Sequence, residues 1–351
     1  MIPVRLVSIA ILVLLTSGTL TAQNAPNPLG QPLLDASGDV RDDAFIQIPL
    51  RADDRRYADI DGDRLKSFLM EVDSISLADR DRGNVFWGRN IGTLGHEETQ
   101  DWVERYFRAN GLENVYRQPF DVGPQWKPEA WTISFSAGGR TFELESARPP
   151  QGAESTPAGG LDFELVWLGT GSEADYIGRD VRGKAVLILD IPRPGTLRHS
   201  IRTEGSVARA FEQGAAAVGI VYGISDNFAV WQRTAGRPGF NLGYQDGLRL
   251  RDLLGGGERV TVNLQMRSEV VSGLQASSVW GTLPGMSDEE ILVIAHMDGY
   301  FQAASDNASG LAAMMGLLEH FANIPRSERP RTIRFLGSVG NHSGPGTGWL
   351  H

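Results

Sequence analysis

The chain has 351 residues, 41% of them hydrophobic, which is enough for two globular domains with apolar cores. Its net charge of -10 argues against a nucleic-acid-binding protein. The absence of cysteine excludes disulfides, thiol catalysis and cysteine metal ligands. Any metal site must therefore be built from histidine and carboxylate side chains.

Residues 1–22 have the pattern of a secretory signal peptide. One charge, Arg5, precedes an apolar run from Leu6 to Leu15, and small and polar residues then lead to Ala22. The run is shorter than the roughly 20 apolar residues of a membrane-spanning helix, so we favour a signal peptide over an anchor. We expect a secreted or periplasmic protein without a membrane attachment after cleavage. Residues 23–58 are predicted to form a flexible leader.

Residues 59–130 are predicted to begin an α/β domain. Apolar residues recur at helical spacing over 60–75 and again over 97–110, where Asn110-Gly111 is a stop signal. A short strand is predicted at 113–121. His96 stands in a polar context at the start of the second helix, so we expect it to be exposed or to cap that helix.

Residues 131–272 have a different texture, in which short apolar strands alternate with glycine-rich turns. We predict a mainly β unit that also contains an alanine-rich helix over 207–219. The strands are predicted at 132–135, 163–168, 184–189 and 260–264.

The third segment, residues 273–351, carries the candidate chemistry. Five apolar residues, Ile291 to Ala295, predict a fully buried strand, and His296 and Asp298 follow on one side of the extended backbone. Asp306 then precedes a helix predicted at 311–321. Imidazole and carboxylate are the usual zinc ligands, and a second carboxylate commonly orients a ligating histidine. The plainer alternative is that these residues have no metal-binding role. His-x-Asp alone is a common pattern, and Asp306 before a helix would then only cap that helix.

The combination is more specific than its parts. The strand, His-x-Asp, and Asp-Asn-Ala-Ser-Gly opening a helix resemble the zinc aminopeptidase and glutamate carboxypeptidase family, metallopeptidase family twenty-eight. The resemblance implies that His296 binds zinc, that Asp298 orients it and that Asp306 bridges two ions. It also implies a mixed doubly wound sheet with flanking helices. Segments 166–171, 180–184 and 214–219 resemble a protease-associated domain, which would be a mainly β insert over 131–272 without chemistry of its own.

The end of the chain departs from that family. In members of that family, the strand equivalent to residues 332–336 is followed by two consecutive glutamates. The first glutamate is a general base, and the second is a zinc ligand. Those positions fall on Asn341 and His342. His342 can bind metal, but an amide such as Asn341 has no usable proton affinity near neutral pH. The metal ligands that come later in the family's sequences have no counterpart here, so the resemblance implies that the C-terminal part of the catalytic domain is missing. His351 could replace one of those later ligands, but we disfavour that interpretation.

Three functions stay open at this point. The first is zinc-dependent hydrolysis of a peptide or protein substrate, most simply removal of an N-terminal residue, with one or two ions and a doubtful second site. The second is a non-catalytic peptide- or carbohydrate-binding paralogue or fragment, which Asn341 favours. The third is an acyltransferase that resembles the glutaminyl cyclases and uses one zinc.

Overall fold

The computed structural model describes residues 51–192, 205–224, 227, 234 and 236–342. The predicted signal peptide, most of the leader and His351 lie outside these ranges. The chain divides into two compact units, Met1–Asp59 and Ile60–His351. The described part of the first contains the short 3-10 helix η1 (Ala52–Tyr57).

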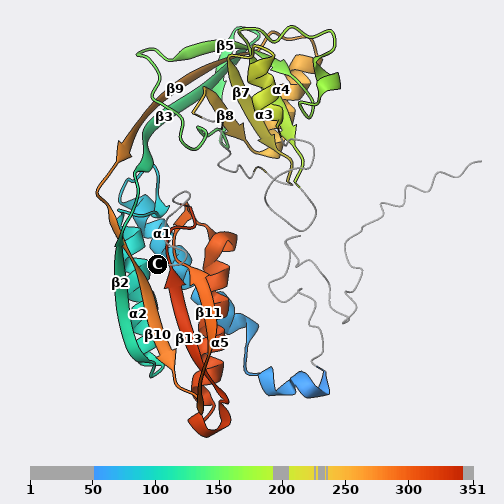
Figure 1. Cartoon of the computed structure of the whole chain (residues 1–351). Coiled ribbons are helices and arrows are strands. Elements are labelled where there is room, and N and C mark those ends of the chain that lie inside the picture. The colour runs from blue at the N-terminus through green and yellow to red at the C-terminus, as the bar shows by residue number, and fades with distance from the viewer. Residues whose placement is uncertain (1–50, 193–204, 225–226, 228–233, 235, 343–351) are drawn as a thin grey trace, which may run out of the picture. The chain divides into compact units, whose positions relative to one another are not determined.

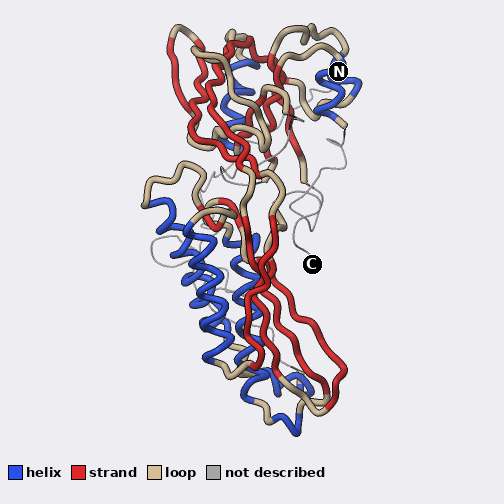
Figure 2. The backbone as a smooth tube through the Cα atoms, turned by 60° about the vertical axis from the view of Figure 1, so that its left-hand side comes forward, coloured by secondary structure: helices blue, strands red, loops and turns tan. Residues whose placement is uncertain are grey.

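A four-stranded mixed sheet carries the segment with the candidate chemistry. The strand order is β11-β13-β10-β2; β11 and β13 run parallel, and the other pairs are antiparallel. The strands are β2 (Glu113–Asp121), β10 (Gln275–Leu283), β11 (Ser287–His296) and β13 (Arg331–Ser338). Three helices lie along one face of this sheet (Figures 1 and 2). They are α1 (Gly62–Asp81), α2 (Leu94–Ala109) and α5 (Ser309–Asn323).

Helices α1 and α2 each begin at a capping side chain. Asp61 caps α1 by accepting a hydrogen bond from the Arg64 backbone, and Thr93 caps α2 through the His96 backbone. The apolar face of α2 packs against the sheet, with Val103 and Phe107 fully buried. The prediction that His96 is exposed or caps α2 is wrong, because its side chain is only 2% exposed and Thr93 is the capping residue. The His96 ring lies on the side of α2 that faces the protein.

Strand β11 lies where the apolar run predicted it, but the prediction that it is fully buried is wrong. Ile291, Leu292 and Ile294 are 46%, 48% and 41% exposed. Among the described strands, β11 pairs with β13 alone and so forms an edge of the sheet. Its Leu292 and Ile294 side chains point away from the helices, because side chains alternate along a strand and Ala295 is buried on the helical side.

Residues 125–271 supply a seven-stranded sheet with the order β4-β3-β9-β5-β6-β7-β8. Its strands are β3 (Gln125–Ala137), β4 (Arg140–Glu143), β5 (Leu161–Trp167), β6 (Ala185–Asp190), β7 (Ala217–Tyr222), β8 (Gly239–Leu242) and β9 (Thr261–Val271). Helices α3 (Ser206–Glu212) and α4 (Tyr244–Gly255) accompany it. The helix predicted over 207–219 is too long, because Gly214 adopts φ +90° and the next apolar residues form β7.

The predicted fold class, an α/β protein with mixed sheets and flanking helices, is confirmed. The protease-associated identity of residues 131–272 and the domain limits stay predictions. Short elements complete the described chain: β1 (Gly88–Arg89), β12 (Gly299–Tyr300), η2 (Glu173–Tyr176), η3 (Ala304–Ala308) and η4 (Arg326–Glu328). Among the described helices, none has both the length and the hydrophobicity that crossing a membrane requires.

Candidate metal centre

The candidate ligands meet at one edge of the four-stranded sheet. His296 ends β11, and its register partner on the parallel strand β13 is Ser338. Asn341 and His342 follow Ser338 within four residues, so they emerge beside His296. The carboxyl ends of parallel strands are where open α/β sheets place ligands. Asp306 reaches the same place from η3, which precedes α5.

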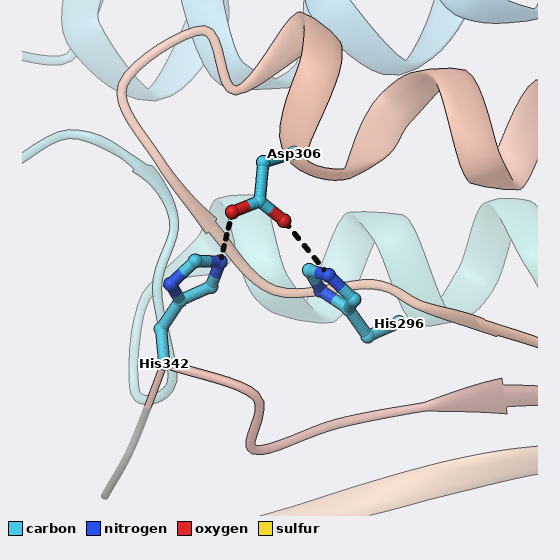
Figure 3. A group of neighbouring side chains, drawn as sticks. All are labelled: His296, Asp306 and His342. Carbon is cyan, nitrogen blue, oxygen red and sulfur yellow. Dashed lines mark hydrogen bonds and ion pairs between the residues drawn. The ribbon is translucent and has the colours of Figure 1, made fainter. Parts of the chain in front are cut away.

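The Asp306 carboxylate lies between two imidazoles (Figure 3). Its Oδ1 is 3.0 Å from His296 Nε2, and its Oδ2 is 3.7 Å from His342 Nε2. One ligand atom from each residue can be chosen so that all three atoms lie within 4.8 Å of one another. The side chains are 15% (His296), 46% (Asp306) and 16% (His342) exposed, so the group is open to solvent on the Asp306 side.

His296 is held in one orientation. Its Nδ1 lies 3.0 Å from the Asp298 backbone oxygen and 3.4 Å from Asp298 Oδ1. Because a carbonyl oxygen only accepts, the proton belongs on Nδ1, and Nε2 faces Asp306. Burial alone would lower the pKa of His296, but hydrogen bonds with Asp298 and Asp306 outweigh it and raise the pKa to about 9.

Asp298 has a second task that its sequence position did not indicate. Its buried carboxylate accepts hydrogen bonds from the backbone N–H groups of Gly340, at 3.2 Å, and His342, at 3.0 Å. Burial would raise the pKa of this carboxyl, but the His296 and His342 side chains and the His342 N–H hold it far below its usual range. One anion therefore both contacts His296 and fixes the backbone that carries His342.

Asn341 also reaches the group. Its Nδ2 lies 3.2 Å from His296 Nε2. The structure thus brings together all five residues singled out from the sequence: His296, Asp298, Asp306, Asn341 and His342. Their roles stay predictions.

Three residues at the site were missed from the sequence. The Tyr300 hydroxyl donates to the His342 carbonyl oxygen at 2.7 Å, and Gln151 Nε2 donates to that hydroxyl at 2.7 Å. Arg89, fully buried on β1, donates to backbone carbonyls between His296 and Asp306. Gln151 precedes Tyr300 by 149 positions, so no local spacing could have linked the two. The complete burial of an arginine likewise has no signature in a single sequence.

Comparison with known proteins gives a family for the segment that carries the site. The family model described as Peptidase family M28 matches residues 278–340. Residues 278–340 are therefore similar to peptidase family M28. The resemblance predicted from the sequence is thereby confirmed, and the matched segment contains His296, Asp298 and Asp306. No curated protein matches the chain.

Solved structures share the fold of this M28-like chain. The Peptidase M28 precursor from Shewanella amazonensis SB2B superposes with a TM-score of 0.60 at 20% identity, covering 82% of this chain and 67% of that one. The aminopeptidase from Aneurinibacillus sp. strain AM-1 gives a TM-score of 0.52 at 21% identity, covering 82% and 64%. The zinc aminopeptidase from Bacillus subtilis gives 0.52 at 20%, covering 78% and 60%. The chain thus spans about 60–67% of the length of these three structures.

Proposed function

We propose that this M28-like chain is an exported, zinc-dependent peptidase that removes N-terminal residues from peptide or protein substrates. The observation that carries the proposal is the convergence of His296, Asp306 and His342 at the carboxyl ends of β11 and β13. The choice of metal and reaction is supported by one structural neighbour, the zinc aminopeptidase from Bacillus subtilis. Export rests on the signal-peptide pattern of residues 1–22.

The donor set fits zinc. Two imidazoles and one carboxylate are the three protein ligands of a catalytic zinc site, which leaves a position for substrate or water. His296, Asp306 and His342 would hold the ion, and we propose one ion because the described residues offer one such group. The chemistry that zinc supplies in such a set is Lewis acidity toward a carbonyl oxygen.

The surrounding residues prepare the ligands. The Asp298 carbonyl keeps the proton of His296 on Nδ1, so the Nε2 lone pair is available once the second proton leaves. Metal and proton compete for His296 Nε2, and its pKa of about 9 means that metal binding should strengthen as the pH rises toward 9. Asp298 stays anionic and keeps His342 in place through the backbone.

A second function is favoured by one observation. Asn341 lies 3.2 Å from His296 Nε2, at the position where the family resemblance places the general base, and it cannot accept a proton there. A protein that binds a peptide through its metal without hydrolysing it would have metal ligands but no general base at this position. The alternative is therefore a non-catalytic peptide-binding protein.

Metal content of the purified chain tests the site. We expect about one zinc per chain, lost in His296→Ala and in Asp306→Asn, because each change removes one of three ligands. His320→Gln is the control, since His320 lies in α5 outside the group. Zinc content that is unchanged in His296→Ala, or absent from the parent chain at saturating metal, would contradict the proposal.

Activity then separates hydrolysis from binding. The chain and Asn341→Glu are compared on a peptide with a free N-terminus and on its acetylated form. A positioned general base contributes about 100- to 10,000-fold, so Asn341→Glu should raise N-terminal residue release by at least about 100-fold. Peptide binding without release in both forms would establish the binding protein. Release of ammonia from an N-terminal glutaminyl peptide would instead indicate a cyclase.

A further inference from the structure

Arg89 is a buried arginine that holds backbone rather than a carboxylate. Its side chain is 0% exposed. Its Nε donates to the Met297 carbonyl oxygen at 3.0 Å, Nη1 to that of Gln302 at 2.9 Å, and Nη2 to that of Ala303 at 3.2 Å. Nη1 also donates to the Ser76 hydroxyl of α1. The guanidinium thus joins α1 to three carbonyls of one short segment.

That segment, residues 297–303, connects His296 to the turn that carries Asp306. It includes two non-glycine residues in the left-handed region, Phe301 at φ +56° and Ala303 at φ +48°. Such residues persist only where the surroundings fix them. Arg89 binds the carbonyl of Ala303 itself and that of Gln302, which lies between the two, so it supports the segment at its least favourable backbone conformation.

The segment also pairs with the strand that carries Arg89. Arg89 is the register partner of Gly299 in the β1–β12 pair. A Cβ added to Gly299 would lie 3.0 Å from Arg89 Nη2 and 2.5 Å from the Ala303 Cβ. The backbone is therefore folded closely over the guanidinium, and a shorter or uncharged side chain cannot reproduce these contacts.

The charge of Arg89 is placed among the carboxylates of the site. Burial lowers its pKa to about 10, while Asp298, Asp73 and Asp306 act in the opposite direction. Arg89 is therefore a cation at neutral pH. It offsets the negative charge that Asp298 and Asp306 bring to the site before any metal is bound.

We propose that Arg89 is a positioning residue for the metal centre. By fixing residues 297–303 it sets the separation of His296 and Asp306 in the metal-free protein, so that two ligands are already in place when metal arrives. The inference rests on the proposed function in that it takes these two residues as ligands. Rigid support of ligands is worth about 10- to 100-fold in metal affinity in known sites.

The chain contains a matched control in Arg329, a second arginine that holds backbone carbonyls. It is 9% exposed and donates to the carbonyls of Pro284, Phe321 and Ile324. These groups lie at the opposite ends of β10 and α5 from the metal centre. Replacing Arg329 removes the same kind of contact without touching residues 297–306.

The experiment compares Arg89→Met, Arg89→Lys and Arg329→Met in the full chain. The first readout is amide hydrogen exchange of the metal-free protein, and the second is Co²⁺ affinity with its visible spectrum. Arg89→Met should speed exchange in peptides covering 297–306 and weaken Co²⁺ binding by about 10- to 100-fold. Arg89→Lys, which keeps the charge but not the fork of donors, should fall between it and the parent chain. Arg329→Met should change neither readout.

The outcomes separate the two proposals. If the parent chain binds Co²⁺ and Arg89→Met binds it equally well, the positioning role is refuted and the proposed function stands. Equal losses in Arg89→Met and Arg329→Met would also refute it, because the effect would then be general destabilisation. If the parent chain binds no Co²⁺, the proposed function fails, and exchange at 297–306 alone decides the role of Arg89. Should Arg89→Met fail to fold, Arg89→Lys and Arg329→Lys are compared by the same readouts.

Discussion

At the scale of single residues, the buried histidine His96 should set part of the acid stability of the protein. Burial lowers its pKa to about 4 from an ordinary value of 6.5, against the opposing effect of Asp298. The unfolded chain therefore binds a proton that the folded chain refuses as the pH falls below 6.5. The resulting loss is about 3 kcal/mol by pH 4, and His96→Phe should remove it. Urea unfolding of both forms at pH 7 and pH 4 measures the difference.

His296 provides a control of opposite sign. Its raised pKa, about 9, stabilises the metal-free fold below pH 6.5, and this contribution is lost as the pH rises through 9. With a chelator present, His296→Gln should flatten the alkaline side of the stability profile and leave the acid side unchanged. An acid side that is the same in His96→Phe and the parent chain would contradict the assignment of His96.

At the scale of elements, the exposed face of β11 should act as an association surface. Leu292 and Ile294 are 48% and 41% exposed on a strand whose outer edge has no partner among the described residues. Unpaired apolar edges promote contact between chains. The double variant Leu292→Thr and Ile294→Thr should reduce concentration-dependent association in sedimentation velocity, with unfolding free energy changed by less than about 0.5 kcal/mol per site.

The neighbouring strand gives the contrasting variant. Phe335 of β13 is 0% exposed in the core between sheet and helices. Phe335→Ala should cost about 3–5 kcal/mol of unfolding free energy. An association constant that is unchanged in the double threonine variant would show that β11 is not the contact surface.

Elements were predictable from the sequence where their own periodicity determines them. Strand β2 has the predicted bounds, and α2 buries three apolar residues of the helix predicted over 97–110: Trp102, Val103 and Phe107. The apolar run of β11 located the strand but not its exposure, because exposure depends on what covers a strand. The burial of His96 could not be predicted for the same reason, because its neighbours in the sequence are polar and suggested a surface residue.

The residues of the candidate site also differ in whether they could be predicted from the sequence. His296, Asp298 and Asp306 lie within eleven consecutive residues, so their types and spacing could be read locally. Arg89 reaches them through the pairing of β1 with β12, more than 200 positions along the chain. Such a contact arises only from the fold, and one sequence contains no record of it.

At the scale of the whole molecule, the described part of the Ile60–His351 unit has separate apolar cores on its two larger sheets. One core lies between the four-stranded sheet and its helices and includes Phe107, and another lies on the seven-stranded sheet and includes Phe240. These two cores share no residue. Side-chain contacts also link the two parts, such as the packing of the Phe86 and Trp126 rings at 5.8 Å. Because each part has its own core, the two parts should unfold in two steps.

Calorimetry of two variants, each in one core, tests this. Phe107 and Phe240 are both 0% exposed, so each truncation to alanine removes a comparable apolar volume. Each should cost about 3–5 kcal/mol, which lowers the midpoint of its own transition by about 10 °C. Saturating Zn²⁺ should raise the transition affected by Phe107→Ala and not the other, because His296, Asp306 and His342 belong to that core's sheet and helices. A single transition that shifts equally in both variants would mean that the two cores fold as one cooperative unit.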